Sequence, residues 1–249
     1  MPLEPYPQPA FALLDERQPI WRFMPMKTFR LFIEPGQLYF RRADLFEDDE
    51  RECLPPDEYV RTVSDRMGSE FNLEGNLETL RQDRQGVFVS CWSAEESIYL
   101  WDKFARGGIA VRSRVGLLKA ALDVMPGRTM IGRVRYSDKP DRYNVLHFAT
   151  TKRPQFNREK EVRAFLWEMS LSPRNPYPYD PKEGIAHSVD VPSMVEEIII
   201  SPYAPPAAIG DVATLLADHG YGGIAVVRSG FTGHDWLLPS KEELEKYSL

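Results

Sequence analysis

The 249-residue chain lacks several features that would place it at once in a broad class of proteins. It has no run of about 18 apolar residues, the length that a helix needs to cross a bilayer. Its first residues, MPLEPYPQPAFALL, are acidic and proline-rich where a secretory signal would be basic and then apolar. It has only two cysteines, Cys53 and Cys91, and neither belongs to a CxxC pair. We therefore expect a cytoplasmic protein without a membrane span, a disulfide framework or a structural zinc site.

Motifs typical of several enzyme classes are also missing. The four histidines are far apart and show no HxH, HxxxH or HExxH spacing, so their pattern gives little support for a metal site. The chain has no GxSxG nucleophile elbow, no phosphate-binding P-loop and no GxGxxG dinucleotide fingerprint. GIAV occurs twice, but the flanking residues do not match and indicate no internal repeat.

Charge is unevenly distributed along the chain. The net charge of −6 argues against a protein that coats nucleic acid, yet residues 103 to 163 hold 15 Lys and Arg against 5 Asp and Glu. An acidic protein with a basic middle third is expected when a phosphate-bearing ligand, a dinucleotide or a polynucleotide, binds at one place. The alternative is that these basic side chains lie on solvent-exposed faces and pair with the acidic ends of the chain.

Hydrophobic periodicity predicts an α+β fold. Residues 1 to 18 contain four prolines and little periodicity, so we expect an extended arm before a single domain of residues 19 to 249. Strands are predicted at residues 20–23, 37–43, 87–93, 107–113, 129–136, 161–168, 195–202 and 222–229. Helices are predicted at residues 26–34, in one or two pieces within 57–84, through 98–101, at 115–125 and at 208–220, with an irregular segment at 173–184. Strands outnumber helices, which favours a mixed or antiparallel sheet flanked by helices.

The stretch KRPQFNREKEVRAF contains two acids, Glu159 and Glu161, at the start of a predicted strand. Residues two apart on a strand point to the same face, so the two carboxylates would share a face with Arg163. Adjacent carboxylates repel each other unless a cation lies close, and Lys152, Arg153 and Arg163 are the candidates. The segment is therefore either a charge-balanced polar site or an exposed strand of alternating charge.

A second group of polar side chains lies on earlier predicted strands. Arg22 stands between two aromatic residues that we expect to face the core, so its guanidinium would lie on the opposite face, in solvent or in a cleft that binds phosphate or ribose hydroxyls. Trp92 either stacks on a base or nicotinamide or closes the core. Ser93, three residues before Glu96, has the form of a helix capping box. Cys91 is either a buried apolar residue or a nucleophile.

These motifs follow an order that resembles a bacterial and phage family described only as a domain of unknown function. The matching segments are WRFM, PGQLYFRRADLFED, VSCWSAEESIYLWDKFARGGIAVRS, YSD, KRPQFNREKEVRAF and EEIIISPYAPP, from about Ile20 to about Val227. The chain departs from the family where EDDERE replaces a DPFEG-like turn and where Phe104-Ala105 replaces a Tyr-containing pair. This resemblance implies no activity.

A looser similarity is to ADP-ribosyltransferases, in which a strand with Arg or His, a serine-containing strand and a later strand opening with ExE follow in this order. The similarity implies an ADP-ribosyltransferase-like fold, NAD as the substrate, Arg22 as the residue that orients NAD, and Glu161, preceded by Glu159, as the catalytic acid. The NAD-binding residues that we associate with it are Ser90, Trp92, Ser93, Arg42 and Arg163. A fixed carboxylate at such a site stabilises developing positive charge and needs no metal.

Three functions remain open at this point. The first is an NAD-consuming transferase or glycohydrolase, a toxin or phage-defence effector. It requires Arg22, Trp92 and Glu161 to converge on one cleft, with Glu161 facing Arg22 across it and the carboxylate within about 10 Å of the guanidinium. The second is a metal-dependent nuclease or nucleic-acid-processing protein, in which Glu159, Glu161 and Lys152 work with a divalent ion. The third is a non-enzymatic sensor or adaptor, in which the same residues bind a small molecule, a nucleotide or a partner.

Overall fold

The computed structural model describes residues 14–46, 53–55, 57–68, 72–123, 128–137, 145–168, 173 and 182–231. Most of the predicted N-terminal arm and most of the irregular segment predicted at 173–184 lie outside these residues. No helix within the described ranges is long and apolar enough to cross a membrane.

Helices and strands alternate irregularly along the described chain. The strands are β1 (Pro19–Met24), β2 (Gln37–Arg42), β3 (Val87–Ser93), β4 (Ile109–Arg114), β5 (Arg128–Arg133), β6 (Arg135–Tyr136), β7 (Thr151–Lys152), β8 (Glu161–Trp167), β9 (Gly184–Ser188), β10 (Glu197–Ile200) and β11 (Ala225–Arg228). The α-helices are α1 (Met26–Ile33), α2 (Asp57–Met67), α3 (Leu73–Asp83), α4 (Ile98–Phe104), α5 (Val115–Leu122), α6 (Val145–Ala149), α7 (Val191–Met194) and α8 (Ala208–Asp218). The 3₁₀ helices are η1 (Ala43–Leu45), η3 (Arg84–Gly86) and η4 (Pro154–Glu159).

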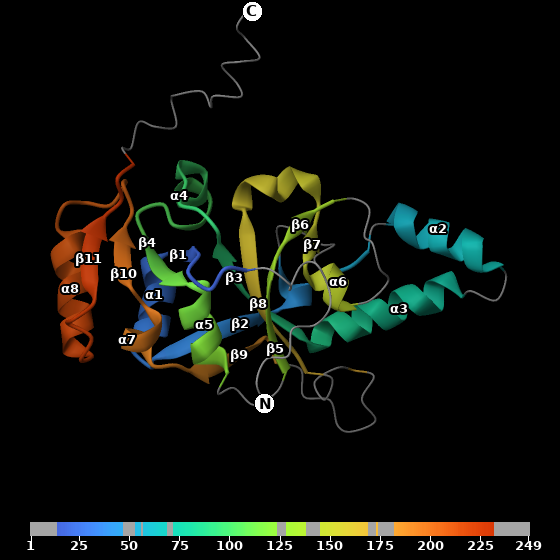
Figure 1. Ribbon diagram of the computed structural model, residues 1–249, viewed down its shortest axis with the longest axis horizontal. Helices are drawn as coiled ribbons and strands as arrows, with labels where there is room; N and C mark the ends of the chain where they lie inside the picture. Colours follow the sequence, from blue (N-terminus) through green and yellow to red (C-terminus); the bar gives the residue numbers. More distant parts are fainter. Residues whose placement is uncertain are drawn as a thin grey trace, which may run out of the picture.

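Nine of the described strands form one sheet. Its order is β11, β10, β4, β1, β3, β2 and β9, with β8 paired to β3 and β5 paired to β8. β10 and β11 run parallel and the other neighbours in this sheet run antiparallel, which confirms the predicted α+β fold with a mixed sheet. Figure 1 shows α8 beside β11 at one end of the molecule and α2 and α3 at the opposite end.

The sheet opens along one edge of β3. β8 pairs with β3 over the whole length of the strand and so occupies one of its two edges. On the other edge, β1 pairs with β3 only at Ser93, and β2 pairs only at Phe88 and Val89. Residues 90–92 lie between these two contacts, so the sheet splits here between β1 and β2.

The two faces of β3 meet different cores. Phe88 and Trp92 belong to a large core that also contains residues of α1, α5 and α8. Val89 belongs to a smaller cluster on the opposite face, and Cys91 packs against it. Because side chains alternate along a strand, Cys91 and Ser93 project away from the large core.

Arg22 lies on a different side of β1 from the one we expected. Its neighbours on the same face, Ile20 and Met24, belong to the large core, whereas Trp21 and Phe23 are partly buried against a smaller cluster that includes α4. The prediction that the two aromatic residues face the main core was therefore wrong. Arg22 is tolerated on the core side because the split between β1 and β2 leaves room for its side chain.

The capping-box prediction for Ser93 was also wrong. Ser93 is the last residue of β3, and the chain runs on through a bend before α4 begins. The N-cap is Ser97, whose Oγ accepts a hydrogen bond from the backbone N–H of Leu100. Ser93 Oγ instead accepts a hydrogen bond from the backbone N–H of Glu95 and donates one to the backbone carbonyl of Glu159.

Candidate functional site

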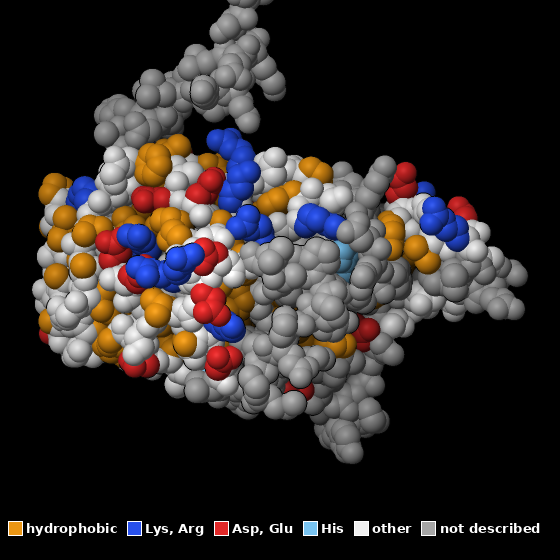
Figure 2. Space-filling view, in the orientation of Figure 1, with side chains coloured by type: hydrophobic (Ala, Val, Ile, Leu, Met, Phe, Trp, Pro, Cys, Tyr) orange, Lys and Arg blue, Asp and Glu red, His pale blue; other side chains and the backbone are white. Residues whose placement is uncertain are grey.

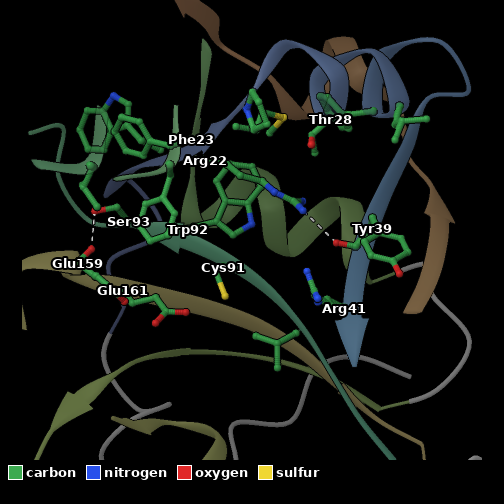
Figure 3. A pocket seen from close by; sticks show the side chains of 18 of the residues that line it. Arg22, Phe23, Thr28, Tyr39, Arg41, Cys91, Trp92, Ser93, Glu159 and Glu161 are labelled. Carbon is green, nitrogen blue, oxygen red and sulfur yellow. Dashed lines mark hydrogen bonds between the residues drawn. The ribbon is translucent and has the colours of Figure 1, made fainter. Parts of the chain in front are cut away.

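A pocket of about 670 Å³ lies where the sheet splits, and residues of β1, β2 and β3 line it (Figure 3). Small-molecule sites typically have volumes of about 300 to 1,000 Å³, mainly apolar walls and a few polar groups. The walls here are mainly apolar and aromatic. The charged residues in the lining are Arg22, Arg41, Lys152, Glu159 and Glu161.

Arg22 spans the split in the sheet. Its Nη1 donates to Ser90 Oγ on β3 at 2.9 Å, and its Nη2 donates to the Tyr39 carbonyl oxygen on β2 at 3.0 Å. The guanidinium carbon lies 6.0 Å from the centroid of the Trp92 ring. Burial lowers the pKa of Arg22 to about 10, so the side chain stays charged at neutral pH. Within the described residues, its hydrogen-bond partners are neutral and no carboxylate forms an ion pair with it.

The three residues expected to line a nicotinamide pocket have different positions. Trp92 and Ser93 line the pocket. Ser90 is buried behind Arg22 and holds its guanidinium instead of forming part of the wall. Ser93 Oγ donates to the backbone carbonyl of Glu159 at 2.9 Å, which fastens the end of η4 to β3.

Glu159 and Glu161 lie close together, but for a different reason from the one the sequence indicated. Glu159 is the last residue of η4, and Lys160 adopts the left-handed conformation with φ of 44° before β8 begins. The two acids therefore do not share a strand. Each is only 4% exposed, so the alternative of an exposed strand with alternating charge is wrong.

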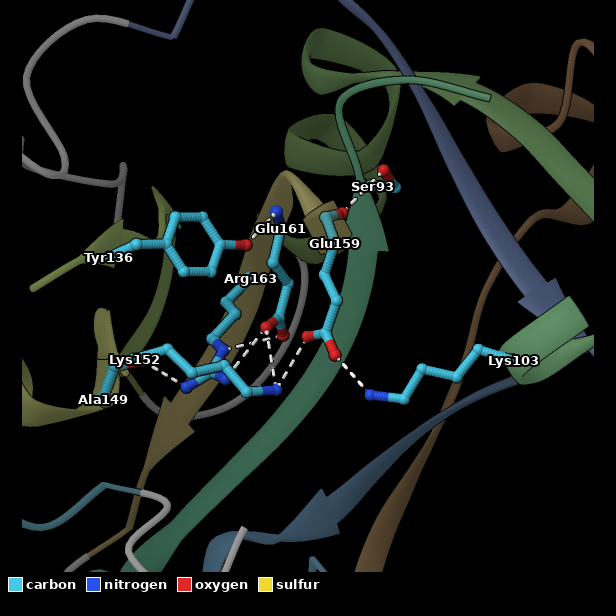
Figure 4. A network of polar contacts seen from close by, with 8 residues as sticks. All are labelled: Ser93, Lys103, Tyr136, Ala149, Lys152, Glu159, Glu161 and Arg163. Carbon is cyan, nitrogen blue, oxygen red and sulfur yellow. Dashed lines mark hydrogen bonds and ion pairs between the residues drawn. The ribbon is translucent and has the colours of Figure 1, made fainter. Parts of the chain in front are cut away.

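Three basic side chains surround the two carboxylates (Figure 4). Glu159 accepts from Lys103 through Oε1 at 2.5 Å and from Lys152 through Oε2 at 2.8 Å. Glu161 accepts two hydrogen bonds from Arg163, at 2.7 Å and 2.9 Å, while Lys152 Nζ lies 3.6 Å from Glu161 Oε2. The two acids and three basic side chains thus form a network of alternating charges. Lys152 contacts both acids, and it lies closer to Glu159 than to Glu161.

Further contacts fix Glu161 and its partner Arg163. The backbone N–H of Glu161 donates to the Tyr136 hydroxyl at 2.7 Å, and Arg163 Nη1 donates to the Ala149 carbonyl at 2.8 Å. Burial alone would raise the pKa of Glu161, but the charges of Arg163 and Lys152 outweigh it and lower the pKa to about 2. Glu161 is therefore an ionised carboxylate with a fixed orientation at neutral pH.

Cys91 lines the same pocket as the Glu161 carboxylate. Burial, followed by the negative charge of Glu161, raises the pKa of Cys91 well above its usual value. A thiol that stays protonated is a poor nucleophile. The raised pKa therefore argues against Cys91 as a nucleophile.

Two of the arginines expected to bind NAD are outside the pocket lining among the described residues. Arg42 forms a paired contact with Asp44, at 2.6 Å and 3.2 Å, and Arg163 is 1% exposed behind Glu161. Arg41 lines the pocket instead of Arg42 because successive strand residues face opposite sides. Arg41 was not predicted as a site residue. It lies two residues from Tyr39, which also lines the pocket, and strand residues at this spacing share a face.

The described residues contain no group of three or more His, Cys, Asp and Glu side chains arranged to hold a metal ion. Both oxygens of Glu159 and both oxygens of Glu161 accept hydrogen bonds from basic side chains. A divalent ion would have to displace these contacts, so the geometry gives no support to the metal-dependent alternative.

Basic residues of the middle third pair with carboxylates both at the pocket and outside it. Lys103, Lys152 and Arg163 converge on the two buried acids, whereas Arg112 and Arg114 pair with Glu197 and Glu196. Figure 2 shows basic and acidic side chains next to one another on the face that it displays. Part of the basic excess is therefore used at the pocket and part in ion pairs outside it.

Comparisons with known proteins give no relative: no family model, no curated protein and no solved structure matches the chain. The function is therefore argued from the pocket and its residues.

Proposed function

We propose that the protein consumes NAD, as an ADP-ribosyltransferase or an NAD glycohydrolase. One observation carries the proposal: Arg22 and Trp92 line a single pocket from the face of the large core, and Glu161 lines the same pocket from the opposite face of the sheet, at the split. Their order along the chain is the order in the ADP-ribosyltransferase similarity. Arg22 hydrogen-bonds Ser90 of the next strand, which ties together two residues that this similarity singles out.

In this proposal Arg22 binds the diphosphate of NAD. A half-buried guanidinium that has only neutral partners among the described residues favours an anion beside it. Aromatic side chains in the lining, Phe23, Tyr39 and Trp92, offer flat apolar surfaces for the adenine and nicotinamide rings. The pocket thus combines an anion-binding group with surfaces that suit heterocycles.

Glu161 provides the chemistry at the nicotinamide ribose. The bond between ribose and nicotinamide breaks with its electron pair going to the ring nitrogen, which neutralises the pyridinium and leaves positive charge on the ribose. A preorganised carboxylate that accepts a hydrogen bond from a ribose hydroxyl stabilises that charge. Water or an acceptor side chain then forms the new bond to the ribose carbon and loses a proton.

The test is nicotinamide release from NAD, measured by liquid chromatography and mass spectrometry, with and without a cell extract that supplies acceptors. We expect Glu161→Gln to lower the rate by at least about a hundredfold, because the substitution removes the carboxylate charge. Glu34→Gln is the matched control, since Glu34 is an exposed acid paired with Arg30 on α1. Turnover by Glu161→Gln at the native rate contradicts the proposal. Binding of NAD without turnover by the native protein favours the ligand-sensor alternative.

A further inference from the structure

Glu161 has room for a further hydrogen bond. A carboxylate offers about four lone-pair sites. Among the described residues, the side chain that occupies these sites at hydrogen-bond distance is Arg163, which uses two of them at 2.7 Å and 2.9 Å. Lys152 Nζ is 3.6 Å from Oε2, beyond normal hydrogen-bond length, so within the described part of the chain a lone pair of Oε2 stays open on a carboxylate that lines the pocket.

Glu159 binds Lys152 more closely than Glu161 does. Lys152 Nζ lies 2.8 Å from Glu159 Oε2, a direct hydrogen bond. Glu159 cannot follow Lys152 toward Glu161, because Ser93 holds its backbone carbonyl and Lys103 binds its other carboxylate oxygen. If Glu159 lost its charge, the nearest remaining carboxylate for Lys152 would be Glu161, and a direct contact between opposite charges is strongly favoured in a buried site.

We propose that Glu159 is a positioning residue that holds Lys152 away from Glu161, so that a lone pair of Glu161 Oε2 stays open to a hydroxyl of the ligand. Glu159 itself makes no contact with the reacting atoms. The inference rests on the proposed function only for the identity of the ligand, which is then a ribose. It assigns the two acids unequal roles, one toward the ligand and one toward Lys152.

The experiment compares the native protein with Glu159→Gln, with Glu159→Gln/Lys152→Met and with the control Lys119→Met, which removes an exposed lysine that pairs with Glu16 outside the pocket. Calorimetry with ADP-ribose and the kcat/KM for NAD are measured for each. We expect Glu159→Gln to weaken both by at least about tenfold, as when one hydrogen bond to a charged group is lost. The double variant should recover most of this loss, and Lys119→Met should stay within about threefold of the native protein.

A crystal structure of Glu159→Gln tests the inference independently of any activity measurement. Lys152 Nζ should close on Glu161 Oε2 from 3.6 Å to hydrogen-bond distance. An unchanged distance between Lys152 Nζ and Glu161 Oε2 overturns the inference. It is also overturned if the double variant binds ADP-ribose as weakly as Glu159→Gln, because Glu159 would then contact the ligand itself. If Glu159→Gln does not fold, Glu159→Asp replaces it in the experiment. This variant keeps the negative charge, and the distance between Lys152 Nζ and Glu161 Oε2 should shorten by less. If Lys152 moves to hydrogen-bond distance of Glu161 in the crystal but neither the native protein nor any variant turns over NAD, the proposed function is wrong. The positioning role of Glu159 is then still supported.

Discussion

Replacing Glu161 by Gln tests the electrostatics of the buried acids through the stability of the fold. The pKa of Glu161 falls from an ordinary value of 4.5 to about 2 in the folded protein, and a shift of this size corresponds to a stabilisation on the order of 3 kcal/mol. Because the pKa is lower in the folded state, this stabilisation is fully present above about pH 4.5 and is lost as the pH falls toward 2. Glu161→Gln lacks the ionisation and so lacks the pH dependence.

The assay is urea denaturation of both proteins at a series of pH values from about 7 down to about 3.5. At neutral pH the native protein should be more stable than Glu161→Gln by on the order of 3 kcal/mol, since the variant also leaves Arg163 and Lys152 with less opposing charge. Below about pH 4.5 the difference should shrink by about 1.4 kcal/mol per pH unit. Glu34→Gln, at an exposed pair, should differ from native by less than about 1 kcal/mol. Parallel pH profiles for native and Glu161→Gln would refute the reasoning.

Three further outcomes are expected from the contacts of the pocket. Alkylation of Cys91 by iodoacetamide at about pH 8, followed by mass spectrometry, should be at least about tenfold slower in the folded protein than in urea. The reason is that burial and the charge of Glu161 raise the pKa of the thiol, and equal rates would show a reactive thiolate. Tyr136→Phe removes the acceptor of the Glu161 N–H and should lower the free energy of unfolding in urea by about 1 to 3 kcal/mol, which an unchanged midpoint would exclude. Ser90→Ala removes the acceptor of Arg22 Nη1 and should weaken ADP-ribose binding in calorimetry by about fivefold; native affinity would mean that Ser90 does not orient the guanidinium.

Local patterns in the sequence predicted most of the elements that carry the pocket. The strand predicted at 87–93 is β3, and the strand predicted at 161–168 is β8, one residue shorter. Their bulky alternating residues fit a buried pleated surface, which short-range sequence can reveal. The helix predicted at 26–34 is α1, which ends at Ile33 before the Pro35-Gly36 turn. The strand predicted at 129–136 is interrupted at Val134 and forms β5 and β6.

Arrangements that depend on contacts between distant segments were not predictable in the same way. The split in the sheet depends on where β1 and β2 pair along β3, and strand register is a long-range property. β9 pairs with β2 although no strand was predicted at 184–188. The proximity of Glu159 and Glu161 was predicted from strand alternation, yet it arises from a left-handed turn at Lys160 and from the shared Lys152. A pair of acids can thus be recognised in a sequence while the geometry that joins them cannot.

The charges that keep Glu161 ionised also oppose the proposed reaction. A positive charge that develops on the ribose is attracted by a carboxylate and repelled by any nearby ammonium or guanidinium. Arg163 lies behind Glu161 and is 1% exposed, whereas Lys152 lines the pocket and faces the same space as the ligand. Glu159 contacts Lys152 directly, so its negative charge offsets the ammonium charge on the side of the pocket where the ribose becomes positive. Glu159 and Lys152 therefore function as a neutral pair, and removal of both should disturb the chemistry at Glu161 less than removal of Glu159 alone.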